Sequence, residues 1–318
     1  MHIPGPSLLR RLSVVTLAVC TSALAACAAA AGDDSTVLCT PHFAVAHAPD
    51  DGTAADLGNL LETLFDRYVG EGRAAGLGLR APPKPLRWRC FDRPDVYREY
   101  VRREEGGLSD AGHAFYSSRS DCVVLLRRRE DALTGTRDRT VGCPDLRRIS
   151  HEAAHQWAFG TGLQTRGVLY PFWIAEGLAV NMERSSLTQG GLGRDNSYRC
   201  GQLIAARLHR RLAPLDDFVI LTAATGDEQK LADLYAQAWG TVSFLFGRDP
   251  AAFRRYLCLL ASRSPGQRPA AALRREFTAS FGPIDALQPA WEVFLANISR
   301  PGADRLATAQ AVSSRSSS

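Results

Sequence analysis

The sequence has little of several features that would place a protein in a specialised class. Lysine occurs only at Lys84 and Lys230, and the formal net charge is +5 over 318 residues. So weak a charge gives no reason to expect a nucleic-acid partner. The eight cysteines include no CxxC pair, which argues against a zinc site built from cysteines. At 45% hydrophobic residues, the chain has enough apolar material for a sizeable core.

The N-terminus carries an apolar run, residues 12–26, that follows Arg10 and Arg11. A basic start, an apolar run and small residues before a cysteine are typical of a secretory signal, and the run is too short for a typical spanning helix. Residues 24–27, Leu-Ala-Ala-Cys, look like a bacterial lipobox, in which Cys27 would be the first mature residue and carry lipid. The alternative is an ordinary signal peptide. We therefore expect export, either lipid-anchored to a membrane of the cell envelope or as a secreted or periplasmic protein.

The remaining chain predicts an α+β fold with a mixed α/β half followed by a helical half. We expect strands at residues 43–45 and 86–91, a β-hairpin over 114–118 and 122–126, and helices over 54–69 and 94–103. From residue 144 almost every segment has helical periodicity. The predicted division is a signal peptide (1–26), a linker (27–35), an α/β part (36–143), a helical part (144–300) and a disordered tail (301–318).

Six cysteines follow Cys27, and an even number in an oxidising compartment suggests disulfides. Cys122 and Cys143 bracket a polar loop, and they are the pair that we favour. Cys258 lies in an apolar helical run, where a buried free thiol is the alternative.

Residues 151–155 form an HExxH motif, with His151, Glu152 and His155. Residues four apart on a helix project from adjacent turns of one face, so two imidazoles can bind one metal ion. The apolar residues of this helix, Leu146, Ile149, Ala153 and Trp157, fall on the adjoining side and are predicted to be buried. The alternative is a histidine pair on a polar helix face.

A catalytic zinc site needs a third protein ligand and an open position for water. The segment WIAEGLA, residues 173–179, places Glu176 near the start of a second helix. The intervening loop contains glycines and Pro171, and it can reverse the chain so that the two helices run against each other. For Glu176 alone, the alternative is an acidic residue favoured at a helix N-terminus by the macrodipole.

The motifs HExxH and WxxEGxA together resemble the gluzincin, or peptidase MA-like, metallopeptidases. The stretches HEAAHQ, PFWIAEGLA and YAQAW look like a poorly characterised group of exported bacterial proteins in that clan. The resemblance implies a zincin-like fold and one Zn²⁺ ion held by His151, His155 and Glu176. It also implies that Glu152 polarises the metal-bound water and, as general base, takes its proton.

Three further residues are candidates for supporting roles. Glu183 lies seven residues after Glu176, an offset at which related enzymes have an acid that supports the site, here by orienting a liganding histidine. A solvated surface glutamate is the alternative, and Asn181 is a weaker candidate for the same role. Tyr235 resembles the tyrosine that stabilises the oxyanion in the aminopeptidase branch, with a core tyrosine as the alternative.

The predicted hairpin over residues 114–126 fits the edge strand that receives an extended peptide in zincins. Phe115 and Tyr116 would then line a substrate pocket, or they pack beneath helices as ordinary strand aromatics. The sequence as a whole predicts an exported zinc metallopeptidase acting on peptides or proteins. An endopeptidase is favoured, because no GxMEN-type segment is present to hold a free amino terminus. The alternatives are a catalytically silent zincin-fold lipoprotein that binds a partner, and hydrolysis of a non-peptide amide.

Overall fold

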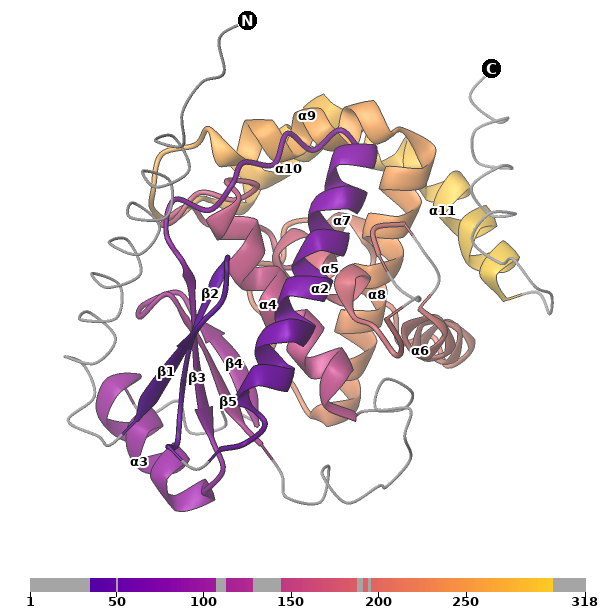
Figure 1. Ribbon diagram of the computed structural model, residues 1–318. Coiled ribbons are helices and arrows are strands. Elements are labelled where there is room, and N and C mark those ends of the chain that lie inside the picture. Colours follow the sequence, from indigo (N-terminus) through magenta and orange to yellow (C-terminus); the bar gives the residue numbers. More distant parts are fainter. Residues whose placement is uncertain are drawn as a thin grey trace, which may run out of the picture. The chain divides into compact units, whose positions relative to one another are not determined.

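The computed structural model describes residues 35–49, 51–106, 113–127, 144–187, 191–193 and 196–299. The chain divides into two compact units, one within Met1–Asp66 and Ala81–Gly135, the other within Arg67–Arg80 and Thr136–Ser318. The first contains a small sheet and the second is helical, so the protein is of the α+β class (Figure 1). Residues 67–80, which the sequence places in the α/β part, group with the helices instead.

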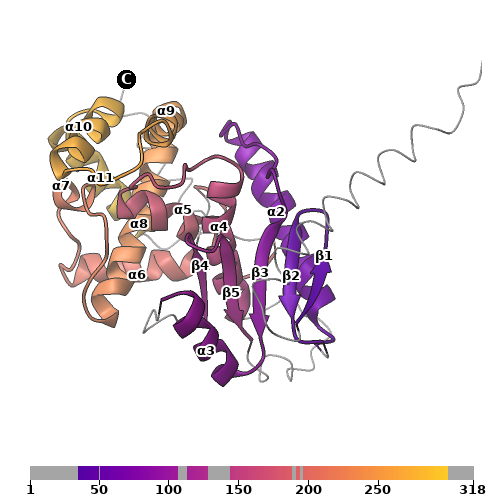
Figure 2. The ribbon, with the colours of Figure 1, turned by 90° about the vertical axis from the view of Figure 1, so that its left-hand side faces the viewer.

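The first unit contains a five-stranded sheet in the order β1-β2-β3-β5-β4 (Figure 2). The strands β2, β3 and β5 are parallel neighbours, while β1 and β4 pair antiparallel at the two edges. Every residue of β2 and β5 is buried, as expected for apolar central strands. The strands are β1 (Thr36–Cys39), β2 (Phe43–His47), β3 (Leu86–Phe91), β4 (Ala114–Ser117) and β5 (Cys122–Leu126).

Two helices pack against this sheet. Helix α2 (Ala54–Ala74) begins in the first unit, where Phe65 meets Phe43 of β2 edge to face at 5.9 Å. Glu62 of α2 accepts hydrogen bonds from the Thr40 hydroxyl at 2.5 Å and from the backbone N–H of His42 at 2.8 Å. These hydrogen bonds connect α2 to the turn between β1 and β2. Helix α3 (Pro94–Glu104) buries Tyr97 and Val101 in a cluster with Phe91, Val124 and Leu126.

The second unit is built around α5 (Phe172–Met182), which packs against both α4 (Pro144–Gly160) and α8 (Glu228–Arg248). All residues of α5 except Ala175 and Glu176 are buried. Trp173 of α5 stacks on Tyr256 at 5.5 Å between ring centroids and meets Phe277 edge to face. The other helices are α6 (Ser197–Leu208), α7 (Leu215–Phe218), α9 (Pro250–Ala261), α10 (Ala270–Phe281) and α11 (Ile284–Ile298).

The predicted elements are confirmed, with two differences. Helix α2 ends at Ala74 rather than near Val69, and β1 is an additional strand that pairs with β2. The apolar side of α4 is buried as expected, since Leu146, Ile149, Ala153 and Trp157 are each at most 5% exposed.

Several sequence-based expectations fall on residues outside the described part of the chain: the signal segment with Cys27, most of the linker, Cys143 and the tail from residue 301. Cys90 is a buried free thiol in β3. Cys258 is a free thiol too, but it is exposed on α9 rather than buried. Within the residues that the structure describes, no helix has the length and apolar character needed to cross a membrane.

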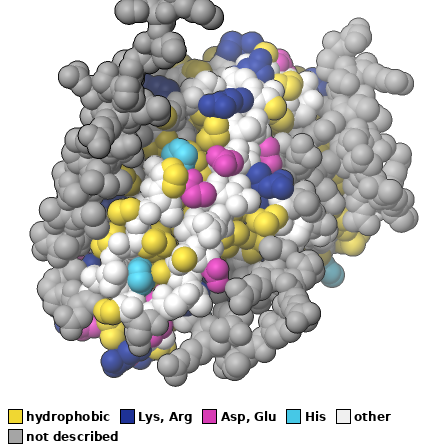
Figure 3. Space-filling model, viewed as in Figure 1, with side chains coloured by type: hydrophobic (Ala, Val, Ile, Leu, Met, Phe, Trp, Pro, Cys, Tyr) yellow, Lys and Arg dark blue, Asp and Glu magenta, His cyan; other side chains and the backbone are white. Residues whose placement is uncertain are grey.

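The surface carries a mixture of side-chain types. Figure 3 shows hydrophobic, basic and acidic side chains interspersed over the face that it displays. Among the described residues visible there, neither sign of charge occupies a large continuous area.

Candidate metal centre

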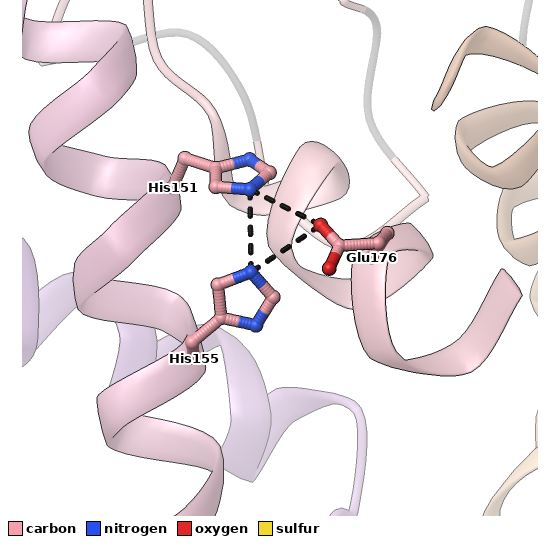
Figure 4. Close-up of side chains that lie close together, drawn as sticks. All are labelled: His151, His155 and Glu176. Atoms are coloured by element: carbon pink, nitrogen blue, oxygen red, sulfur yellow. Dashed lines mark hydrogen bonds and ion pairs between the residues drawn. The ribbon is translucent and has the colours of Figure 1, made fainter. Parts of the chain in front are cut away.

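Helix α4 presents two histidines, His151 and His155, one turn apart on the same face (Figure 4). Their Nε2 atoms lie 3.2 Å apart, and their side chains are 12% and 16% exposed. A histidine pair on a polar, solvated helix face would be far more exposed. The two imidazoles therefore share one partly enclosed space beside the buried side of the helix.

Glu176 reaches the same space from α5 (Figure 4). Its Oε2 atom lies 3.3 Å from His151 Nε2 and 3.4 Å from His155 Nε2. The chain reverses between the two helices through Gly162 and Gly167, which have φ angles of 77° and 78°. Side chains other than glycine rarely adopt this backbone region, so these glycines permit the turn that brings Glu176 to the histidines.

The separations of these three atoms match the requirements of a metal ion. Two ligand atoms that each lie about 2.1 Å from a tetrahedrally coordinated zinc ion are about 3.4 Å apart. The ligand atoms of His151, His155 and Glu176 all lie within 4.8 Å of one another, and their contacts are 3.2–3.4 Å. Glu176 Oε2 is buried and makes no hydrogen bond. A buried carboxylate oxygen without a hydrogen bond is costly, so the cluster could hold a metal ion.

The charges around the cluster also favour a cation. Burial would lower the pKa of His151, but its interactions with Glu176 and Glu183 outweigh burial and raise the pKa to about 10. Burial would likewise raise the pKa of Glu176, yet His155 and His151 hold it far below the usual range. The carboxylates of Glu176, Glu183 and Glu152 therefore all act on His151, and positive charge is stabilised near them.

Glu183 follows the last residue of α5 and contacts the other nitrogen of His151. Its Oε1 atom lies 3.1 Å from His151 Nδ1, and its side chain is 3% exposed, which excludes a solvated surface glutamate. Burial opposes ionisation, but His151 and Arg199 lower the pKa of Glu183 to about 2. Asn181 instead faces α8, where its Nδ2 donates to Trp239 O at 3.2 Å and its Oδ1 accepts a hydrogen bond from the Ser243 hydroxyl at 3.1 Å.

Tyr235 lies on α8, half-buried, with its ring centroid 6.1 Å from that of His151. Burial, together with the carboxylates of Glu176 and Glu152, raises its pKa, so the phenol stays protonated at neutral pH and can donate a hydrogen bond. Glu152 is half-buried on α4, and its charge acts on both His151 and Tyr235. The structure thus brings the residues predicted for the zinc site and its chemistry close to His151.

Phe115 and Tyr116 lie on β4, the edge strand of the sheet, and both are half-buried. Phe115 packs on the cluster around Phe91 and Tyr97, and the Tyr116 hydroxyl donates to Asp121 at 3.2 Å. These contacts give both rings a structural role within the first unit. Their role in binding substrate stays a prediction.

Sequence reasoning missed Arg199 and Asn196, which contact Glu183 from α6. The asparagine before a helical segment is a recognisable N-cap, so the start of α6 carried a signal. No local pattern connected that helix start to Glu183, because the contact joins residues that are 16 positions apart.

A comparison with protein families matches residues 145–267 to a family described as a protein of unknown function, DUF1570. A search of curated proteins finds no match. The matched stretch contains the three residues of the metal cluster as well as Glu152, Glu183, Arg199 and Tyr235. The family match therefore covers the whole candidate centre without assigning it a reaction.

Proposed function

We propose that this protein is a zinc-dependent metallopeptidase of the gluzincin type, with a zincin-like fold, that cleaves bonds within polypeptides. The observation that supports it best is the convergence of His151 Nε2, His155 Nε2 and Glu176 Oε2 at separations of 3.2–3.4 Å. Glu152 lies within the same motif, as a proton acceptor must. Endopeptidase activity is favoured because the sequence contains no GxMEN-type segment to hold a free amino terminus.

His151, His155 and Glu176 would hold one Zn²⁺ ion, since two nitrogens and one carboxylate oxygen form a known ligand set of catalytic zinc. When bound, zinc acts as a Lewis acid that polarises a substrate carbonyl and lowers the pKa of water. Glu183 would keep His151 oriented by accepting a hydrogen bond from Nδ1–H, so that Nε2 is the nitrogen left to bind the ion.

The remaining steps belong to the side chains of this chain. Glu152 would accept the proton of the attacking water as the new carbon–oxygen bond forms, and would deliver it to the leaving amine as the carbon–nitrogen bond breaks. Tyr235 would donate a hydrogen bond to the carbonyl oxygen as negative charge develops there. Its raised pKa suits this role because the phenol remains a donor.

The proposal is tested by zinc content together with the substitution Glu152→Gln. Wild-type protein should contain about one zinc ion per chain and hydrolyse members of a broad peptide library. Glu152→Gln should keep the zinc but lose about 10²–10⁴-fold in rate, because an amide cannot accept the proton. Glu228→Gln is the matched control, since Glu228 is exposed at the start of α8.

Each opposite result has a specific meaning. Activity that survives Glu152→Gln unchanged would reject the mechanism. Full zinc occupancy without hydrolysis of any peptide or amide would instead favour a silent zincin-fold protein that binds a partner. Only trace zinc after supplementation would reject the metal centre itself.

A further inference from the structure

Arg199 is a partly buried cation, 13% exposed, that contacts two residues of the candidate centre without being a ligand. Its Nη2 and Nε atoms lie 2.5 Å from Glu183 Oε1 and 2.9 Å from Glu183 Oε2, so the guanidinium binds both carboxylate oxygens. Its Cζ atom also lies 5.5 Å from the centroid of the Tyr235 ring, within cation–π range. One side chain therefore links Glu183, which contacts His151, with Tyr235.

The start of α6 holds Arg199 in this position. Asn196 is the N-cap of α6, and its side chain accepts a hydrogen bond from the backbone N–H of Arg199 at 3.1 Å. The amide of Asn196 donates to Glu183 Oε2 at 3.3 Å and to Val180 O at 3.2 Å. These hydrogen bonds connect the beginning of α6 to the end of α5. Arg199 is held both by its backbone N–H and by its side chain.

The geometry of Glu183 depends on this arginine. Glu183 is 3% exposed, and a buried carboxylate needs a charged partner to remain ionised and in place. Its Oε1 atom is shared, because it faces Arg199 on one side and His151 Nδ1 on the other. The planar guanidinium holds both oxygens, so it also fixes the direction from which Oε1 meets the imidazole.

We propose that Arg199 is a positioning residue of the metal centre, which acts on His151 through Glu183 and steadies the ring of Tyr235. The inference rests on the proposed zinc site. A lysine at this position would keep the positive charge. It would lose the two-point contact with Glu183 and the planar group that faces the Tyr235 ring. Loss of the partner behind a metal-bound histidine typically weakens metal binding by about 10–100-fold.

The test is the zinc affinity of the full-length protein, freed of metal and titrated with Zn²⁺ in competition with a chromophoric chelator. Arg199→Gln should weaken binding about 10–100-fold, and Arg199→Lys should recover part of that loss. Glu183→Gln should resemble Arg199→Gln, and the double variant should bind no more weakly than the weaker single variant. Arg207→Gln is the matched control, because Arg207 lies on the same helix and points to Ser299 and Glu292.

Two further measurements separate positioning from general loss of stability. Thermal unfolding of the metal-free variants reports stability, and the visible spectrum of the Co²⁺-loaded protein reports the ligand geometry. If Arg199→Gln does not fold, the zinc affinities of Arg199→Lys and of the double variant Glu183→Gln/Arg199→Gln test whether Arg199 acts through Glu183. A changed Co²⁺ spectrum in Arg199→Lys at wild-type stability would support positioning.

The inference is overturned if Arg199→Gln binds Zn²⁺ as tightly as wild type, or if its loss adds in full to that of Glu183→Gln. Neither result changes the interpretation of the Glu152→Gln experiment, which tests the proposed peptidase activity. Conversely, wild-type protein that binds zinc but hydrolyses nothing would overturn the proposed peptidase while leaving the affinity test valid. Wild-type protein that binds no zinc would overturn both proposals.

Discussion

His151 has a different partner at each ring nitrogen. Nδ1 faces Glu183 at 3.1 Å, and Nε2 faces His155 and Glu176. A hydrogen on Nδ1 is stabilised by the carboxylate, so the proton that a metal ion would displace from His151 is the one on Nε2. His151 is thus oriented by contacts from outside the helix that carries it.

Tyr235 is proposed to donate a hydrogen bond to the substrate and not to bind the metal, so the two functions can be measured separately. Tyr235→Phe should leave zinc content unchanged and lower turnover, because it removes one hydrogen-bond donor to the developing oxyanion. The loss of such a donor typically costs about 10²–10³ in rate. Steady-state kinetics that resolve kcat from KM check this prediction.

Tyr256→Phe is the control for that substitution, since the Tyr256 hydroxyl on α9 has no hydrogen-bond partner among the described residues and its loss should leave kcat unchanged. An unchanged kcat in Tyr235→Phe would contradict a role in stabilising the oxyanion and would indicate that Tyr235 only packs in the core. A loss of zinc in the same variant would mean that the phenol supports the ligands instead.

At the scale of elements, the position of Glu176 depends on how closely α5 approaches α8. A Cβ atom on Gly177 would lie 2.7 Å from Val242 Cγ2 and 2.9 Å from the carbonyl oxygen of Ala238. No side chain fits in this contact without movement of one helix. The glycine next to Glu176 is therefore required by the packing of α5.

Gly177→Ala should destabilise the protein by about 1–3 kcal/mol, the usual cost of overpacking a core. It should also weaken zinc binding, because α5 carries Glu176. The matched control is Gly201→Ala on α6, where an added Cβ meets no atom within 4 Å. That substitution should be neutral or stabilise by up to about 1 kcal/mol.

Urea unfolding monitored by circular dichroism measures both substitutions. Equal stabilities for Gly177→Ala and Gly201→Ala would contradict the packing argument for α5. A Gly177→Ala protein of normal stability with unchanged zinc affinity would show that α5 can shift without moving Glu176.

At the scale of the whole molecule, we propose that the precursor is exported and cut before Cys27, which then carries lipid. Mass spectrometry of the mature N-terminus, after expression in a bacterium, should find a lipid-modified peptide that begins with Cys27. Cys27→Ser should remove the modification and release the protein from the membrane fraction, because a lipid chain adds about 0.8 kcal/mol of membrane affinity per buried CH₂.

Three outcomes distinguish the alternatives for the N-terminus. An unmodified peptide that begins after Cys27 would indicate an exported protein without a lipid anchor. An N-terminus at Met1 would contradict export. Only the lipid-modified peptide supports attachment to a membrane of the cell envelope.

The sequence by itself determined the features that depend on local periodicity. The HExxH spacing places His151 and His155 on one helix face, and the apolar residues around Glu176 predict a buried helix, because both patterns repeat within one element. Strand β5 follows from a short apolar segment between turn residues, and β3 follows from the alternation of arginines with apolar residues. These elements, and the cluster His151, His155 and Glu176 as a possible metal site, were therefore predictable.

Only the tertiary structure decided which residues support the cluster from other elements. The sequence left Glu183 open between a solvated residue and a partner of His151, because burial at the end of a helix depends on what packs there. Arg199 was not predicted at all, since its contacts with Glu183 and Tyr235 join three separate helix positions. Such contacts arise when helices pack, and no spacing along the chain encodes them.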